Sequence, residues 1–250
     1  MKRAVLTACL LFLTPFSFAE EGSFHFQSGQ TQNTLVEFYT SEVLKSCNPA
    51  EAWFNNFKNS EQCFKQVIPV SFHFNKWDDR TWKDKFAISG SSTRFLSYAR
   101  LWNARGVYAP VVVINGVEWS GWAKGQAMPS FSRKVGVLSV EATQGGDIAV
   151  SFNPTDKNAL DWTVHAALLG CEIESKITRG ENANKKLAHE FVALAYDSQA
   201  MRKSYTSDWK ARIQLSMPPG MGPKRRAVAV WITEGENPIP LQAAGRYFTA

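Results

Sequence analysis

The sequence is poor in three features that would each define a common protein class. It has 4 cysteines in 250 residues, too few for a small disulfide-rich scaffold. Only 20% of the residues are charged while 44% are hydrophobic, which excludes a wholly disordered chain. The one long apolar run lies at the extreme N-terminus, so no internal transmembrane helix is predicted. What remains is enough apolar material for one large or two small folded domains.

The sequence also lacks the usual signs of a nucleic acid partner, a metal or a cofactor. The 28 Lys and Arg exceed the 22 Asp and Glu only mildly, and the one basic run, Lys224-Arg225-Arg226, follows a Pro-Gly turn. No pair of cysteines or histidines has metal-ligand spacing, and no Gly-rich phosphate loop or serine nucleophile motif is present. We therefore expect no nucleic acid partner, no cofactor and no metal.

The N-terminus has the three parts of a secretory signal. Lys2 and Arg3 precede an apolar run over 4–13, and the small residues Ser17 and Ala19 follow. This pattern predicts a signal peptide over 1–19, cleaved after Ala19, and a periplasmic or secreted protein with no integral membrane segment after cleavage.

Cleavage would leave an odd number of cysteines in the mature chain. It removes Cys9 and keeps Cys47, Cys63 and Cys171. At least one thiol is then unpaired within a monomer, which is notable in an oxidising compartment.

Strand and helix patterns alternate between residues 34 and 131. Strands are predicted at 35–39, 67–74 and 111–114, and helices from Asn48 and over 92–105. Asn115-Gly116 predicts a hairpin turn. The order strand, helix, strand, helix, strand, strand favours an α/β thioredoxin-like domain over 20–134, with a central sheet flanked by helices.

From about residue 135 the pattern changes to a period of two. A hairpin is predicted over 135–152 around Gly145-Gly146, and further strands at 162–174, 187–196, 209–215 and 227–232. This spacing is typical of a mostly-β, sandwich-like domain, which we expect over 135–250.

Cys47 is the leading candidate for chemistry. It follows the first predicted strand and directly precedes the predicted helix start at Asn48-Pro49. Backbone N–H groups and the helix dipole stabilise a thiolate at such a position.

Several segments together resemble the secreted thioredoxin-like family known as domain of unknown function 1223. They are Thr40 to Glu51, Ser71 to Asp78, Trp82 to Ala87, Tyr108 to Gly116, and Gly180-Glu181-Asn182 with Leu187 and His189. The resemblance covers nearly all of the mature chain. It implies a thioredoxin fold, a β-rich C-terminal part and export, and it implies that Pro110 is a cis-proline facing the thiol site. The family has no settled activity.

The chain departs from the family motif at one position. Members typically carry Cys-x-x-Cys, whereas this chain has Leu44-Lys45-Ser46-Cys47, so the first cysteine is missing. Dithiol cycling needs a second thiol within reach. Cys63 lies beyond a helix of about ten residues, roughly 15 Å away, which disfavours a disulfide with Cys47.

Three functions follow from a single thiol at this position. The first is monothiol redox chemistry by Cys47, with Pro110 shaping the site and a thiol- or disulfide-bearing protein or small thiol as partner. The second is a non-catalytic binding or scaffold protein, because the second cysteine of such motifs is usually buried and inert. The third is a thiol peroxidase.

Other polar residues have a simpler interpretation. His73 lies in an apolar strand and is expected to be a core or edge histidine. His165, His189 and Cys171 have no metal-ligand spacing. Asp78 and Asp84 stay open as helix caps or groove residues, with Arg94 and Arg100 as salt-bridge partners. The segment 180–184 is either a recognition loop or a tight turn that needs Gly and Asn.

Overall fold

The computed structural model describes residues 22–159, 161–205, 207–221 and 223–248, so the predicted signal peptide lies outside the described residues. In the described residues there are two α-helices, α1 (Asn48–Asn55) and α2 (Ser89–Leu101), and three 3₁₀ helices, η1 (Lys45–Cys47), η2 (Asn56–Asn59) and η3 (Gly121–Lys124). The strands are β1 (Ser23–Gln27), β2 (Thr34–Thr40), β3 (Val67–His73), β4 (Val111–Ile114), β5 (Val117–Glu118), β6 (Gly136–Thr143), β7 (Asp147–Pro154), β8 (Trp162–Cys171), β9 (Ile173–Lys176), β10 (Lys186–His189), β11 (Val192–Ala200), β12 (Arg202–Lys203), β13 (Trp209–Gln214), β14 (Arg225–Glu234) and β15 (Pro240–Phe248).

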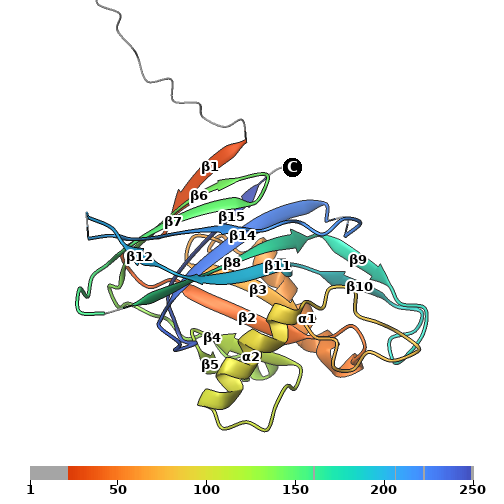
Figure 1. Ribbon diagram of the computed structural model, residues 1–250. Coiled ribbons are helices and arrows are strands. Elements are labelled where there is room, and N and C mark those ends of the chain that lie inside the picture. The colour runs from red at the N-terminus through yellow and green to blue at the C-terminus, as the bar shows by residue number, and fades with distance from the viewer. Residues whose placement is uncertain (1–21, 160, 206, 222, 249–250) are drawn as a thin grey trace, which may run out of the picture.

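One large sheet combines strands from both halves of the chain. Its order is β15-β14-β8-β11-β3-β2-β4-β5 (Figure 1). The parallel pair β2 and β3 lies inside the sheet, with the antiparallel strand β4 beside β2. The junction between the halves is the pairing of β3 with β11, where Val192 lies opposite Ser71. At the far edge, β5 has only two residues.

This arrangement shows that the predicted fold class is wrong. The chain is mostly β, and the described residues hold two α-helices among fifteen strands, not an α/β thioredoxin-like domain with a helix-flanked sheet followed by a separate sandwich. The physical reason for this difference is the pairing of strands. The buried apolar runs of β2, β3 and β4 need neighbours on both sides, and β11, β8, β14 and β15 supply them on one side.

A second sheet packs against the first. Its order is β1-β6-β7-β13-β12, and the first described strand pairs with β6. Leu138, Val140 and Phe152 of this sheet share a buried cluster with Val164 and Val230 of the large sheet. Alternation of buried and exposed residues along β6 and β7 places one face of each strand in this core, as the period of two predicts.

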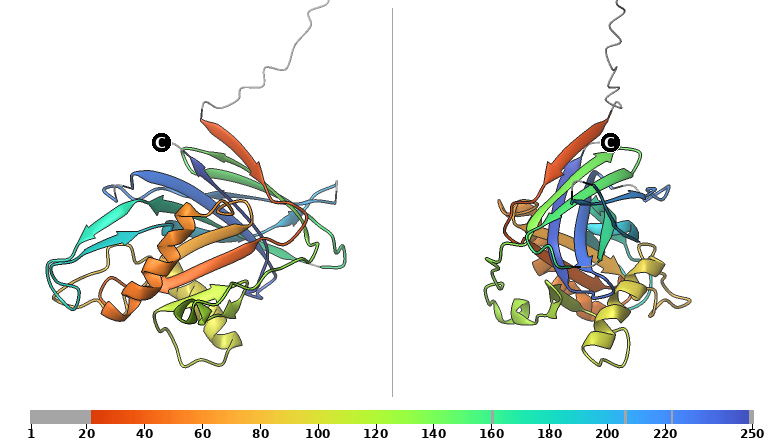
Figure 2. Two further views of the ribbon diagram at one scale, coloured as in Figure 1. Left: turned by 180° about the vertical axis from the view of Figure 1, so that it is seen from behind. Right: turned by 60° about the vertical axis from the view of Figure 1, so that its left-hand side comes forward.

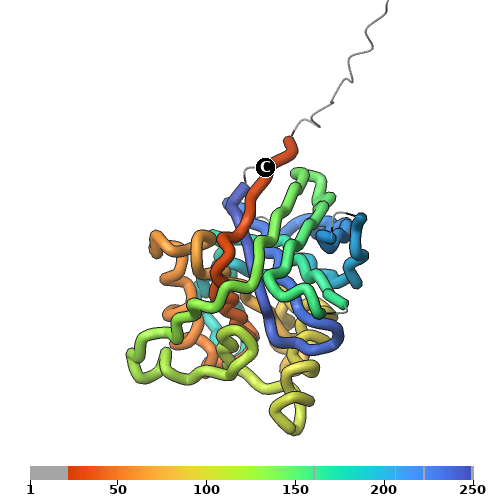
Figure 3. Tube along the Cα trace, turned by 90° about the vertical axis from the view of Figure 1, so that its left-hand side faces the viewer, coloured from red at the N-terminus to blue at the C-terminus, as the bar shows by residue number. Residues whose placement is uncertain are grey.

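The two ends of the described chain lie side by side. Figure 3 shows β1 passing close to the C-terminal end of β15. The rings of Phe24 and Phe248 are stacked with centroids 5.1 Å apart, and Arg246 donates a hydrogen bond to the His25 carbonyl. The second sheet is therefore fastened to the last strand of the first.

The helices pack on the large sheet through aromatic side chains. Phe54 of α1 contacts Phe38 of β2 with ring centroids 5.1 Å apart, and α1 lies over β2 in the view from behind (Figure 2). Phe95 of α2 meets Tyr39 edge to face at 5.0 Å. Helix α2 starts three residues earlier than predicted and ends at Leu101, because Asn103 has a φ of 56° and leaves the helical region.

Most of the individual strand predictions are confirmed. Strands occupy the predicted segments around 35–39, 67–74, 111–114, 209–215 and 227–232, and Asn115-Gly116 forms the turn between β4 and β5. The sequence patterns did not reveal β1 and β15. Within the described residues, no helix is both long and apolar enough to cross a bilayer.

Candidate functional site

Cys47 is a fully buried thiol at a helix start. It is the last residue of η1 and the N-cap of α1, followed by Pro49 in the first turn, as the sequence predicts. Its exposed fraction is 0%. Burial raises the pKa of the thiol above its usual value, and the opposing effects of Thr40 and the Ser41 backbone do not outweigh it. The helix start therefore does not produce a ready thiolate at Cys47.

Pro110 lies at the same end of β2 as Cys47. The Ala109–Pro110 peptide bond is cis, as the family resemblance implies. Pro110 directly precedes β4, whose first residue, Val111, lies opposite Tyr39. Tyr39 is followed by Thr40, which neighbours Cys47. The two predicted site residues are thus brought to one end of one strand.

Cys47, Cys63 and Cys171 are all free thiols. Cys63 is half-buried, and its sulfur lies 3.9 Å from the hydroxyl oxygen of Tyr247. Burial raises the pKa of Cys63 to about 11 and that of Cys171 to about 12. The Cys63 side chain is the most accessible of the three.

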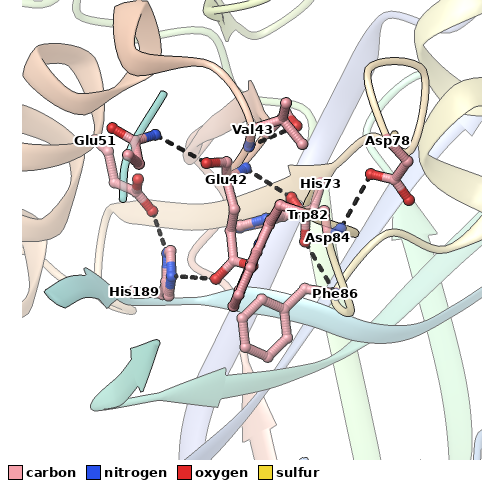
Figure 4. A network of polar contacts seen from close by, with 11 residues as sticks. Glu42, Val43, Glu51, His73, Asp78, Trp82, Asp84, Phe86 and His189 are labelled. Atoms are coloured by element: carbon pink, nitrogen blue, oxygen red, sulfur yellow. Dashed lines mark hydrogen bonds and ion pairs between the residues drawn. The ribbon is translucent and has the colours of Figure 1, made fainter. Parts of the chain in front are cut away.

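One buried polar cluster is centred on His189 of β10. Its Nδ1 donates to Oε1 of Glu51 in α1 at 2.5 Å, and its Nε2 donates to Oε1 of Glu42 at 3.0 Å (Figure 4). Trp82 Nε1 donates to the other oxygen of Glu42 at 2.9 Å. Since both ring nitrogens face carboxylates, His189 is held as an imidazolium between two acids.

Electrostatics reinforce this assignment. Burial opposes a charge on His189, yet the Glu51 charge and hydrogen bonds to both glutamates raise its pKa to about 10. Burial likewise opposes ionisation of Glu42, yet hydrogen bonds from His189 and Trp82 lower the pKa of its carboxyl to about 2. The two groups are therefore both charged over the whole neutral range.

His73 and Asp84 form a second buried pair beside the first. His73 Nδ1 donates to Asp84 Oδ2 at 2.8 Å, and both side chains are 0% exposed. Asp84 also accepts the backbone N–H groups of Glu42 and Phe86. The rings of His73 and His189 lie edge to face with centroids 5.3 Å apart. Asp84, left open by the sequence, thus joins the two pairs into one buried cluster.

The segment 180–184 packs against the turn that carries Cys47. Glu181 accepts the Lys45 N–H at 3.0 Å, and Asn182 donates to the Glu42 carbonyl at 2.8 Å. Gly180 and Asn184 have φ values of 81° and 64°. These positive φ values are those that a tight turn requires of Gly and Asn, as the sequence predicts. The turn also holds Glu42 in position through the hydrogen bond from Asn182.

The salt bridge expected between Arg94 and an aspartate is wrong. Arg94 binds Glu37 through Nε at 2.9 Å and through a second nitrogen at 3.2 Å, in a buried pocket beside Tyr98. Glu37 lies on the central strand β2, so α2 places its one buried arginine over the sheet and not over the loop that holds Asp78 and Asp84.

Glu42, Glu51 and His189 were not predicted as a group. His189 lies 138 residues after Glu51, so only the fold brings it to the two glutamates. One local signal was present: Glu51 follows Cys47 by four residues, which is one helical turn and hence the same face.

Comparison with known proteins gives a family and a fold. The model of the family described as "Protein of unknown function (DUF1223)" matches residues 35–233. The chain belongs to this family. No curated protein matches it. The match of the DUF1223 model spans the site from Glu42 to His189.

Two solved structures resemble this DUF1223 chain. A crystal structure of a protein from Agrobacterium tumefaciens is 18% identical, with a TM-score of 0.58, over 88% of this chain and 96% of that one. The structure entitled "HBP35 of Porphyromonas gingivalis" is 11% identical, with a TM-score of 0.55, over 88% of this chain and 76% of that one. At these identities the likeness concerns the fold alone.

Proposed function

We propose that this DUF1223 chain is an exported, non-catalytic binding or scaffold protein, in which the cysteine of the family motif is a protected structural thiol. We infer that other members of the family carry the first cysteine of a Cys-x-x-Cys motif at the position that Leu44 occupies in this chain. The N-terminal signal pattern over 1–19 supports export to the periplasm or beyond the cell.

One observation carries the proposal: the thiol of Cys47 is 0% exposed and its pKa is raised. Disulfide exchange and peroxide reduction both require an accessible thiolate. Monothiol redox chemistry and thiol peroxidase activity, the two other functions weighed from the sequence, are therefore less well supported than a binding role.

Differential alkylation of the folded mature protein tests the proposal, with peptide mass spectrometry as the readout. We expect Cys63 to label slowly and increasingly at alkaline pH, while Cys47 and Cys171 label only after unfolding. The accessible Cys63 and the buried Cys171 are the internal controls. Rapid labelling of Cys47 near neutral pH, or peroxide consumption that Cys47→Ser abolishes, would overturn the non-catalytic assignment in favour of thiol chemistry.

A further inference from the structure

The buried cluster contains three side chains that are arranged as metal ligands. Glu51, His73 and His189 each offer one ligand atom, and these atoms lie within 4.8 Å of one another. They come from α1, β3 and β10, three separate elements of the fold. Local sequence spacing therefore cannot reveal the group, which explains why no metal was predicted from the sequence.

One nitrogen in this cluster has no partner. His73 Nε2 is buried and accepts or donates no hydrogen bond in the described part of the chain, although its side chain is 0% exposed. Because Asp84 is hydrogen-bonded to Nδ1, Nε2 is the ring nitrogen left to bind another group. A buried polar atom without a partner is costly, and native structures rarely leave one without a reason.

Each histidine is also oriented by a carboxylate on its other nitrogen. Asp84 holds Nδ1 of His73 and Glu42 holds Nε2 of His189. The two nitrogens left to converge on Glu51 are Nε2 of His73 and Nδ1 of His189. A carboxylate behind each histidine is the usual arrangement around protein metal ions, where it fixes the ring and raises its basicity.

The charge of the cluster favours a cation. The three carboxylates of Glu42, Glu51 and Asp84 are buried and contact imidazole, indole and backbone N–H groups in the described residues. Two imidazole rings face three carboxyl groups in this cluster, so the acidic side chains outnumber the basic ones. Buried charges of this kind are normally paired or bind metals.

We propose that Glu51, His73 and His189 form a binding site for one divalent zinc ion, with Asp84 and Glu42 as positioning residues. Two imidazoles and a carboxylate are a known donor set for zinc. Ligand atoms at about 2.0–2.2 Å from an ion lie roughly 3.5 Å apart, so small side-chain rotations would close the site. On binding, His189 Nδ1 gives its proton to solvent and the ion takes its place beside Glu51.

Access to the site lies on the side of Glu51. Its side chain is 8% exposed, whereas those of His73, His189 and Asp84 are 0% exposed. Glu51 is thus the ligand that an entering ion meets first.

The inference rests on the proposed binding role and names its ligand, yet the two can fail separately. The thiol of Cys47 is outside the donor set, so Cys47→Ser should bind zinc as the parent protein does. Alkylation decides whether Cys47 is reactive, and zinc titration decides whether the cluster binds metal.

The test is a calorimetric zinc titration of the untagged mature protein after removal of metal with a chelator. We expect one equivalent to bind, and to be retained through gel filtration with the metal measured by mass spectrometry. His73→Gln and His189→Gln should abolish retention, and Asp84→Asn should lower affinity about 10–100-fold, as expected of a partner behind a ligand. His25→Gln, at an exposed position on β1, is the matched control and should bind normally.

Folding is checked separately, because a buried histidine variant can lose stability. Circular dichroism in chelator establishes whether each variant is folded, and Glu51→Gln supplies a ligand variant near the surface. In the folded protein, Co²⁺ should give visible absorption bands that Glu51→Gln removes or alters. No binding to the folded parent protein, or equal binding by the parent and folded His73→Gln, would refute the zinc site.

Discussion

The Glu42 carboxyl couples the stability of this protein to pH. Its pKa is about 2 in the folded chain against an ordinary value of 4.5, because the hydrogen bonds from His189 and Trp82 outweigh burial. A lowered pKa in the folded state gives stability that is fully present above the unfolded value and is lost as pH falls through the folded one. With free metal removed by a chelator, we expect protonation of Glu42 to lower the free energy of unfolding by about 3 kcal/mol between pH 4.5 and 2.

Urea unfolding at a series of pH values measures this loss. Glu42→Gln removes the ionisable group, so its unfolding free energy should be lower near neutral pH and should fall less steeply below pH 4.5. His189 has the opposite sign: its raised pKa gives stability that is present below about 6.5 and is lost as pH rises toward about 10. An unchanged acid slope in Glu42→Gln would mean that this carboxyl is not the acid-sensitive group.

For single residues, the sequence predicted the place in a helix or strand better than the burial and the contacts of the side chain. Cys47 does cap a helix, and Pro110 does follow a cis bond. The hydrogen bonds that join the residues beside Cys47 to the turn at 180–184, in the second half of the chain, were not predicted. His73 was assigned to the core, where it lies. Its relation to Asp84, eleven residues away along a loop, has no periodic signal and could not be read from the sequence.

The turn between β6 and β7 offers a test at the scale of elements. Gly146 has a φ of 83°, and a Cβ atom there would lie 1.9 Å from the Leu215 carbonyl oxygen, a contact that backbone movement alone can relieve. Gly145, its neighbour, has ordinary φ and its nearest contact would be 3.6 Å away. We expect Gly146→Ala to lower the unfolding free energy by about 1–3 kcal/mol.

Gly145→Ala is the matched control in the same turn and should change the unfolding free energy by less than about 0.5 kcal/mol. Urea denaturation of the two variants side by side provides the measurement. Equal effects of the two substitutions would mean that the turn rearranges freely and does not hold β7 against Leu215.

Most of the individual strands were predicted from the sequence, but the pairing between strands was not. Hydrophobic period and turn residues such as Asn115-Gly116 are local, and they located most of the strands. Strand pairing is not local. That β3 would pair with β11, more than a hundred residues further along, depends on which apolar faces fit together in the whole chain. The strands β1 and β15 were not predicted, because polar residues interrupt their apolar runs. These residues are His25 and Gln27 in β1 and Gln242 and Arg246 in β15.

The whole molecule should unfold as one unit, because the large sheet is built from both halves. We expect a single urea transition by both tryptophan fluorescence and far-ultraviolet circular dichroism. A fragment of residues 20–134 would leave β3 without β11, exposing a buried central strand. We expect that fragment alone to aggregate or stay unfolded, as judged by circular dichroism and gel filtration.

A soluble, cooperatively folded fragment of residues 20–134, or two separate transitions in the full chain, would contradict this expectation. The control is a chain of residues 20–250 prepared in the same way. Either contrary result would mean that the pairing between β3 and β11 contributes little to the folding of the first half.

The large sheet also ends in a way that limits self-association. Beyond β4 it continues only into β5, which is two residues long and turns away into η3. A long exposed edge would offer a row of unpaired amide and carbonyl groups to the next molecule, the first step of fibril growth. Here that row is too short to template another strand, so this border of the sheet is protected against edge-to-edge pairing with a second molecule.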